Sequence, residues 1–406
     1  MVVTIADPDV RFPNAHWQHT RMNLTVLPFR SPLAAYEQQA ESLLAAHRAA
    51  DPAAIDLFHR KHPRFLDEKI KWRPKFIPDT EIRDAALSLD DARLTVARYY
   101  DVLDWPSLVA HVQTVSRDGA VFEFESAVEA VVNGDLAVLE DTLRRDPALV
   151  HARSSRVCCF DPPVHHATLL HYVAANGVEA YRQKTPPNAV EITRALLEAG
   201  AEPDAIADMY GAECTTMSML VSSSHPAKAG LQVPLVELLL DFGAAIEGRG
   251  TRKWGGPLVT ALTFGMSGAA KALARRGARI DLPAAAGLGF VDEAGHLLPT
   301  ADAEARHRAL SLAAQHGHAE IVRLLLDAGE DPNRYNHEGN HAHTTPLHQA
   351  VLVGDTAVVR LLVERGARLD IRDTIWHGTP LGWARHGGGK RQAEMVEYLR
   401  SLGAPE

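Results

Sequence analysis

A repeated pattern constrains the fold of this chain more than any other feature. The clearest copy runs from Thr344 to Asp373 and begins Thr-Thr-Pro-Leu-His-Gln-Ala. From Thr345 to Gly366, the glycine that closes the second apolar stretch, the offset is 21 positions. The same offset of 21 recurs in two other pairs, Arg308 to Gly329 and Gly256 to Gly277. Self-similarity of this kind indicates stacked structural repeats, in which each unit packs mainly on its neighbours.

The Thr-Pro-Leu-His-x-Ala start resembles the ankyrin repeat, a helix–turn–helix unit of about 33 residues. Small residues stand where a first helix must pack closely, and leucine runs form an apolar stripe on a second helix. Weaker copies, several with insertions, cover residues 127–150, 167–200, 214–243, 282–299 and 378–404. The resemblance therefore implies an all-α ankyrin-repeat solenoid of about eight repeats over residues 122–406.

The first third of the chain has a different pattern. Asp51 followed by Pro52 is a helix start signal, and helical spacing continues to residue 115. We predict an extended or disordered entry at residues 1–30 and a small helical domain at 31–115. A similar pattern precedes ankyrin repeats in many bacterial proteins, a largely uncharacterised family. The matching residues are Leu94, Ala97, Arg98, Tyr99, Trp105, Pro106, Leu108 and His111.

Composition limits the partners and the compartment. The net charge of −9, from 42 basic and 51 acidic residues, argues against a nucleic-acid partner. The basic stretch from His59 to Phe76 is therefore read as a solvated face. No apolar run is long enough for a membrane span, so we predict no membrane partner. Three cysteines and no secretory signal predict a cytoplasmic protein.

The candidate partner-binding residues follow from the ankyrin resemblance. In such arrays the partner surface is a concave groove made of loop tips and first helices. Carried onto this sequence, the groove positions are His165, Asn176, Trp254, Phe264, His316, His341, His343, Trp376 and His377. Exposed aromatic residues in a groove are candidate binding hot spots. The favoured hypothesis is a binding scaffold for a protein or peptide partner, because no catalytic motif appears.

An alternative hypothesis rests on an insertion at residues 177–192. It carries Tyr181, Arg182 and Lys184, and a nearby loop at 208–216 carries Tyr210 and Glu213. Arginine and lysine here could receive a carboxylate or phosphate. The alternative is a small-molecule-binding protein or an enzyme with acid–base or hydrolytic chemistry, metal-assisted or not, with its site between these segments. Whether the chain is an enzyme stays open.

Two clusters contain metal-ligand residue types. One holds His337, His341, His343 and His348, and the other holds Cys158, Cys159, Asp161, His165, His166 and His171. Neither spacing matches a standard closed metal site, so we predict no metal and no cofactor. We expect instead that the rings of the first cluster pack loop against loop, and that the second cluster is a proline-rich loop with two buried small thiols. For His171 and His348, the signature histidines, we expect hydrogen bonds to the backbone of a neighbouring loop.

Overall fold

The structure, a computed structural model, describes residues 24–117, 119–251, 254–386 and 392–405. Residues 1–23, most of the predicted extended entry, lie outside the described residues. The chain divides into two compact units, here called the N-terminal unit, which ends at Thr216, and the C-terminal unit, which begins at Met217. The described residues contain no helix whose length and apolar character would let it cross a membrane.

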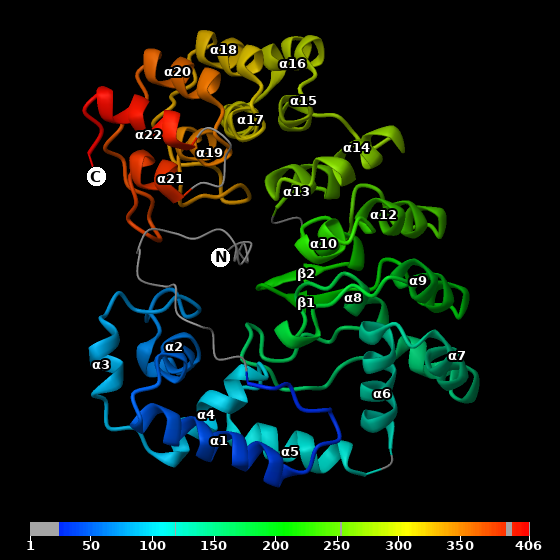
Figure 1. Cartoon of the computed structure of the whole chain (residues 1–406). Coiled ribbons are helices and arrows are strands. Elements are labelled where there is room, and N and C mark those ends of the chain that lie inside the picture. The colour runs from blue at the N-terminus through cyan, green and yellow to red at the C-terminus, as the bar shows by residue number, and fades with distance from the viewer. Residues whose placement is uncertain (1–23, 118, 252–253, 387–391, 406) are drawn as a thin grey trace. The chain divides into compact units, whose positions relative to one another are not determined.

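The N-terminal unit is mostly helical, as the sequence predicts (Figure 1). Its α-helices are α1 (Leu33–Arg48), α2 (Pro52–Lys61), α3 (Asp79–Arg83), α4 (Leu89–Tyr99), α5 (Trp105–Val115), α6 (Ala120–Asn133), α7 (Leu136–Arg145), α8 (Leu169–Val173) and α9 (Ala189–Glu198). The predicted start at Asp51 is confirmed, since its carboxylate accepts hydrogen bonds from the backbone N–H groups of Ala53 and Ala54. Short 3-10 helices occupy Pro63–Phe65, Pro147–His151 and Ala180–Arg182.

A short hairpin departs from the all-α expectation. Strand β1 (Ala207–Met209) pairs antiparallel with β2 (Ala212–Cys214), and Met209 lies opposite Ala212. The two residues of the turn, Tyr210 and Gly211, have φ angles of 55° and 67°. Two positive φ angles in a two-residue connection match the right-handed twist of a hairpin. The sequence predicts only a loop here, so the hairpin is a correction.

Helix α10 (Thr216–Leu220) starts at the boundary between the units, and the C-terminal unit continues as successive helix pairs. Its helices are α11 (Ser224–Lys228), α12 (Gln232–Asp241), α13 (Pro257–Thr263), α14 (Ser267–Arg275), α15 (Leu282–Leu288), α16 (Val291–Leu297), α17 (Ala303–Gln315), α18 (Ala319–Asp327), α19 (Pro346–Val353), α20 (Thr356–Glu364), α21 (Pro380–His386) and α22 (Gln392–Ser401). A short 3-10 helix covers Leu298–Thr300. First helices pack on first helices, α15 on α17 and α17 on α19, and second helices likewise, α18 on α20.

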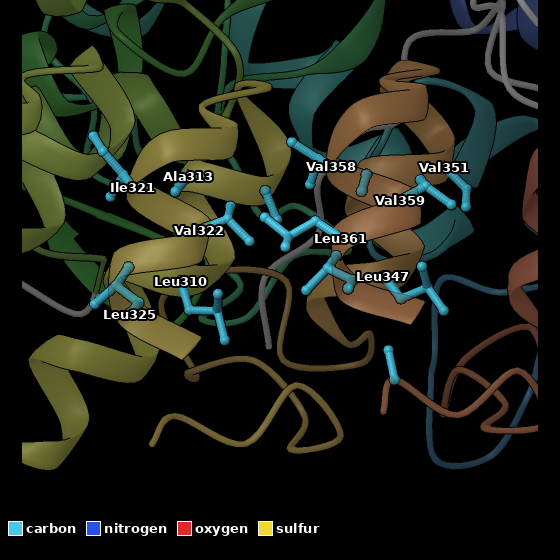
Figure 2. Close-up of a cluster of buried hydrophobic side chains, with 14 of the residues drawn as sticks. Leu310, Ala313, Ile321, Val322, Leu325, Leu347, Val351, Val358, Val359 and Leu361 are labelled. Carbon is cyan, nitrogen blue, oxygen red and sulfur yellow. The ribbon is translucent and has the colours of Figure 1, made fainter. Parts of the chain in front are cut away.

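Leucine, isoleucine and valine side chains fill the space between these pairs (Figure 2). Leu310 of α17, Ile321 of α18, Leu347 of α19 and Val358 of α20 have no solvent-exposed surface. These residues follow the helical spacing expected of an apolar stripe, so the helices share one core across repeat boundaries. Burial of each such side chain contributes roughly 1.5–3 kcal/mol relative to leaving it exposed.

Candidate functional site

Four of the predicted groove residues meet in the C-terminal unit, and we call them the histidine face: Phe264, His316, His341 and His343. The ring of Phe264 lies 6.3 Å from that of His341 in an edge-to-face arrangement. The His341 and His343 rings lie 6.1 Å apart, also edge to face. All four side chains are half-buried. Residues far apart in the sequence therefore form one ordered surface.

The end of helix α13 holds two of these rings in place. The last carbonyl groups of a helix have no partner within the helix and need donors from elsewhere. The Nε2 atom of His316 lies 2.9 Å from the Leu262 carbonyl oxygen, and Nε2 of His341 lies 2.8 Å from that of Thr263. The amide of Gln315 also donates to the Thr263 carbonyl, at 2.8 Å. These bonds hold the two histidine rings in place.

The histidines of this face are uncharged near neutral pH. Burial lowers the pKa of His316 and of His341 despite their bonds to backbone carbonyls. Burial, helped by neighbouring His341, lowers the pKa of His343 to about 4. Neutral imidazoles beside a phenyl ring make a surface suited to aromatic and aliphatic contacts.

The remaining predicted residues of this unit lie in two loops. Trp254 is buried, and Trp376 is half-buried and packs against the core shown in Figure 2. His377 is exposed, with a φ angle of 57°. Buried Asp373 shapes their loop, because its carboxylate accepts from the backbone N–H groups of Trp376 (2.5 Å) and Gly378 (2.7 Å). Sequence reasoning missed this aspartate.

The signature histidines have the structural role expected of them. Nε2 of His348 lies 3.3 Å from the Gly378 carbonyl oxygen, and Nε2 of His171 lies 3.4 Å from that of Cys214. Nδ1 of each ring faces the threonine hydroxyl at the start of its helix, 2.8 Å from Thr345 for His348 and 2.9 Å from Thr168 for His171. The prediction that they bond the backbone of a neighbouring loop is confirmed for His348, whereas His171 bonds the last residue of strand β2.

In the N-terminal unit the insertion folds inward and completes a buried ion cluster, defined here as Glu125, Arg156, Glu179 and Arg182. Arg182 lies 2.5 Å from a carboxylate oxygen of Glu125 and 3.8 Å from one of Glu179. Arg156 lies 3.6 Å from the same Glu179 oxygen. All four side chains are almost fully buried. The sequence suggests that Arg182 could bind the carboxylate of a ligand; in the structure it pairs with carboxylates of the chain itself.

Arg156 connects this cluster to the preceding helices. It donates through Nη2 to the Tyr100 carbonyl (3.0 Å) and through Nη1 to the Tyr181 hydroxyl (2.7 Å). Burial would raise the pKa of Glu179, but His165, Arg182 and Arg156 together lower it well below its usual value. Glu179 is therefore a buried carboxylate kept ionised by its neighbours, and the predicted helical domain and the insertion share one polar interior.

Cys158, His165 and Glu179 could in principle hold a metal ion, since their potential ligand atoms all lie within 4.8 Å of one another. However, Nδ1 of His165 accepts from the backbone N–H of Ala167 at 3.1 Å. A neutral ring must then carry its proton on Nε2, the atom that faces Glu179 at 3.6 Å. That nitrogen would have to lose its proton before it could ligate a metal ion.

One further feature opposes a cation at this place. Arg156 and Arg182 bring positive charge within 3.8 Å of the Glu179 oxygen that would ligate it. Burial and the Glu179 carboxylate also raise the pKa of the Cys158 thiol far above its usual value. Together these residues form an internal ion network.

The other predicted residues of this unit divide into a bonded pair and two exposed side chains. The hydroxyl of Tyr210 donates to the Asn176 side-chain oxygen at 2.8 Å and accepts from the Gly177 N–H at 3.2 Å. Lys184 and Glu213 are exposed. The insertion is thus anchored to the hairpin turn by Tyr210. Within it, Tyr181 and Arg182 are hydrogen-bonded to other residues of the chain.

Comparison with known proteins agrees with the helix pairs just described. The family model for ankyrin repeats (3 copies) matches residues 282–373 and 310–405. The C-terminal unit therefore carries ankyrin repeats. The matched residues include His316, His341, His343 and Trp376 of the candidate surface.

Several curated proteins match parts of the chain. Serine/threonine-protein kinase VIK of Arabidopsis thaliana is 37% identical over 131 residues, 30% of this chain and 28% of the relative. Ankyrin repeat and SAM domain-containing protein 6 of Mus musculus is 34% identical over 115 residues, 28% of this chain and 12% of the relative. Protein PhlB of Serratia liquefaciens is 36% identical over 73 residues, 18% of this chain and 30% of the relative. The chain spans less than a third of each of these relatives.

Proposed function

We propose that this chain is a cytoplasmic binding scaffold that recognises a protein or peptide partner through the histidine face of its C-terminal unit. Ankyrin repeats generally mediate protein–protein interaction, which supports the class of function. We further propose that the helix pairs of the C-terminal unit are repeats of a solenoid, so that the face forms part of its concave groove.

One observation carries this proposal: the rings of the histidine face are already fixed in the unbound protein. His316 and His341 are tied to the carbonyl groups that end α13, and Phe264 packs against His341. Side chains that are ordered before binding lose little conformational entropy when a partner docks. A half-buried aromatic ring among uncharged imidazoles is also the composition found at the centres of protein interfaces.

The proposal is tested by affinity capture from a cell lysate with the full chain as bait, followed by direct binding of the purified partner. The test variant is Phe264→Ala, which removes the aromatic contact from the face. The matched control is Arg323→Ala, an exposed position on the second helix α18. We expect Phe264→Ala to weaken the partner by about tenfold or more, as for a hot-spot aromatic, and Arg323→Ala to leave its affinity unchanged.

Folding of both variants is checked by thermal unfolding before capture. Equal affinity of the partner for the wild type and for a folded Phe264→Ala protein would show that this face is not the contact surface. Failure to capture any protein with the wild type would count against the scaffold function itself.

A further inference from the structure

An arginine at the edge of the histidine face makes no ion pair with any residue that the structure describes. Nη2 of Arg308 donates to the carbonyl oxygens of Trp254, at 2.5 Å, and Gly339, at 3.3 Å. These carbonyls belong to the loop before α13 and the loop before α19. Within the described part of the C-terminal unit, the partners of this guanidinium are these carbonyl groups, and Asp281 and Glu304 act on it only from farther away.

The environment of Arg308 makes this charge costly. Burial lowers its pKa and outweighs the more distant Asp281 and Glu304, which act in the opposite direction. Its Nε atom is buried without a hydrogen-bond partner. Carbonyl oxygens satisfy donors but do not neutralise a full charge, and buried charges in proteins are normally paired. An anion from outside the chain would supply the missing pair.

The third nitrogen, Nη1, makes no hydrogen bond to the residues that the structure describes, and the side chain is partly exposed. A glycine keeps this atom uncovered. A Cβ atom at Gly255 would lie 3.2 Å from Nη1, and the φ angle of +88° at this residue also disfavours any other amino acid. The chain therefore leaves space beside the guanidinium where a side chain would otherwise cover it.

Arg308 is continuous with the histidine face. The Gly339 carbonyl that accepts from Arg308 also accepts from the Thr263 hydroxyl at 3.4 Å. The carbonyl of the same Thr263 accepts from His341. A partner lying on Phe264 and His341 would thus have an unpaired guanidinium at the border of its contact area.

We propose that Arg308 binds a carboxylate of the polypeptide that docks on the histidine face, an Asp or Glu side chain or a free C-terminus. This proposal rests on the proposed scaffold function and adds the chemical class of one partner residue. Charge complementarity selects the group, because a carboxylate supplies the counter-charge and accepts a charge-assisted hydrogen bond from Nη1. The neutral histidines nearby favour apolar residues next to that carboxylate in the partner.

The test uses phage-displayed random linear peptides selected on the full chain. We expect the selected peptides to share an acidic residue or a free C-terminal carboxylate at one aligned position, next to an apolar residue. Replacing that Glu by Gln in a selected synthetic peptide should weaken its binding to the wild type by about tenfold or more. The same replacement should have little effect on binding to the Arg308→Gln variant.

Since Arg308→Gln could also loosen the two loops, Arg308→Lys provides a second measurement. It retains the positive charge, so its preference for Glu over Gln in the peptide should persist in part. Selected peptides that compete at the face but lack any acidic position would overturn the role of Arg308 and leave the scaffold function standing. Selection of phosphopeptides alone in a parallel phosphorylated library would also overturn it, and failure to select any peptide would count against both proposals.

Discussion

The guanidinium of Arg182 lies 2.5 Å from the carboxylate of Glu125, and both side chains are almost completely shielded from water. A third group, Glu129, which is partly exposed, lies 3.0 Å from the same nitrogen. The Arg182 side chain thus joins helix α6 to the insertion through charges that water cannot screen. Removing one member of such a pair leaves the others buried without compensation.

We therefore expect Arg182→Met to destabilise the chain by about 3–5 kcal/mol, because Glu125 and Glu179 lose their principal counter-charge. Urea unfolding followed by circular dichroism would measure the change. The matched control is Arg144→Ala, which removes an exposed ion pair with Asp141 on α7 and should cost less than about 1 kcal/mol. A loss from Arg182→Met as small as that from Arg144→Ala would contradict the role given to the buried ion cluster.

The same residue shows how far the sequence can be interpreted. A polar insertion with Tyr181, Arg182 and Lys184 indicates an anion-binding segment, and the sequence shows nothing more specific. Two of the carboxylates that Arg182 meets, those of Glu129 and Glu125, lie 53 and 57 positions earlier, in α6, and no local spacing relates them to it. Apolar periodicity predicted the helices because it is local, whereas the partners of a buried charge depend on tertiary packing.

The histidine face gives a second example. Its residues could be placed on loop tips and first-helix ends from the repeat register. The contacts of His316 and His341 with α13 could not, because these residues lie 54 and 78 positions after the carbonyl groups that they contact. In the sequence, Arg308 only marks the start of one repeat. Its lack of an ion pair depends on the fold, which places two loop carbonyl groups beside it.

Stability of the C-terminal unit should fall in mild acid. Burial lowers the pKa values of His343 and His348 to about 4, whereas in the unfolded chain each is near 6.5. The unfolded state therefore takes up protons first as the pH falls below about 6.5, which favours unfolding until the pH reaches about 4. Asp373, which acts in the opposite direction on both rings, does not outweigh burial.

We expect the free energy of unfolding to drop between pH 7 and pH 5 by about 1–2 kcal/mol for each of these histidines. Urea unfolding at the two pH values would measure the drop. His343→Gln should reduce the drop by the share of one histidine, since glutamine does not titrate. A free energy of unfolding that is the same at pH 7 and pH 5 would contradict neutral burial of these rings.

The start of helix α20 depends on one aspartate. The carboxylate of Asp355 accepts from the backbone N–H of Val358 at 2.9 Å. Asp355→Ala should cost about 1 kcal/mol, the usual contribution of such a cap. Asp135 stands at the corresponding place before α7 but makes no side-chain cap hydrogen bond, so Asp135→Ala should have a clearly smaller effect. Thermal unfolding of the two variants would compare them, and equal losses would argue against a specific cap at Asp355.

The close contact of α13 with α15 requires a glycine. A Cβ atom at Gly287 would lie 2.7 Å from Cδ1 and 3.2 Å from Cγ of Leu262, whose side chain is itself fully buried. Gly287→Ala would therefore push two first helices apart, and we expect a loss of about 1–3 kcal/mol in urea unfolding. Gly295, in α16, has no atom within 4 Å of the corresponding position, so Gly295→Ala should stabilise the chain by about 0.4–1 kcal/mol through helix propensity. Changes of opposite sign in the free energy of unfolding would separate the effect of packing from the effect of helix propensity. An increase in that free energy for Gly287→Ala would show that the two helices can move apart at no cost.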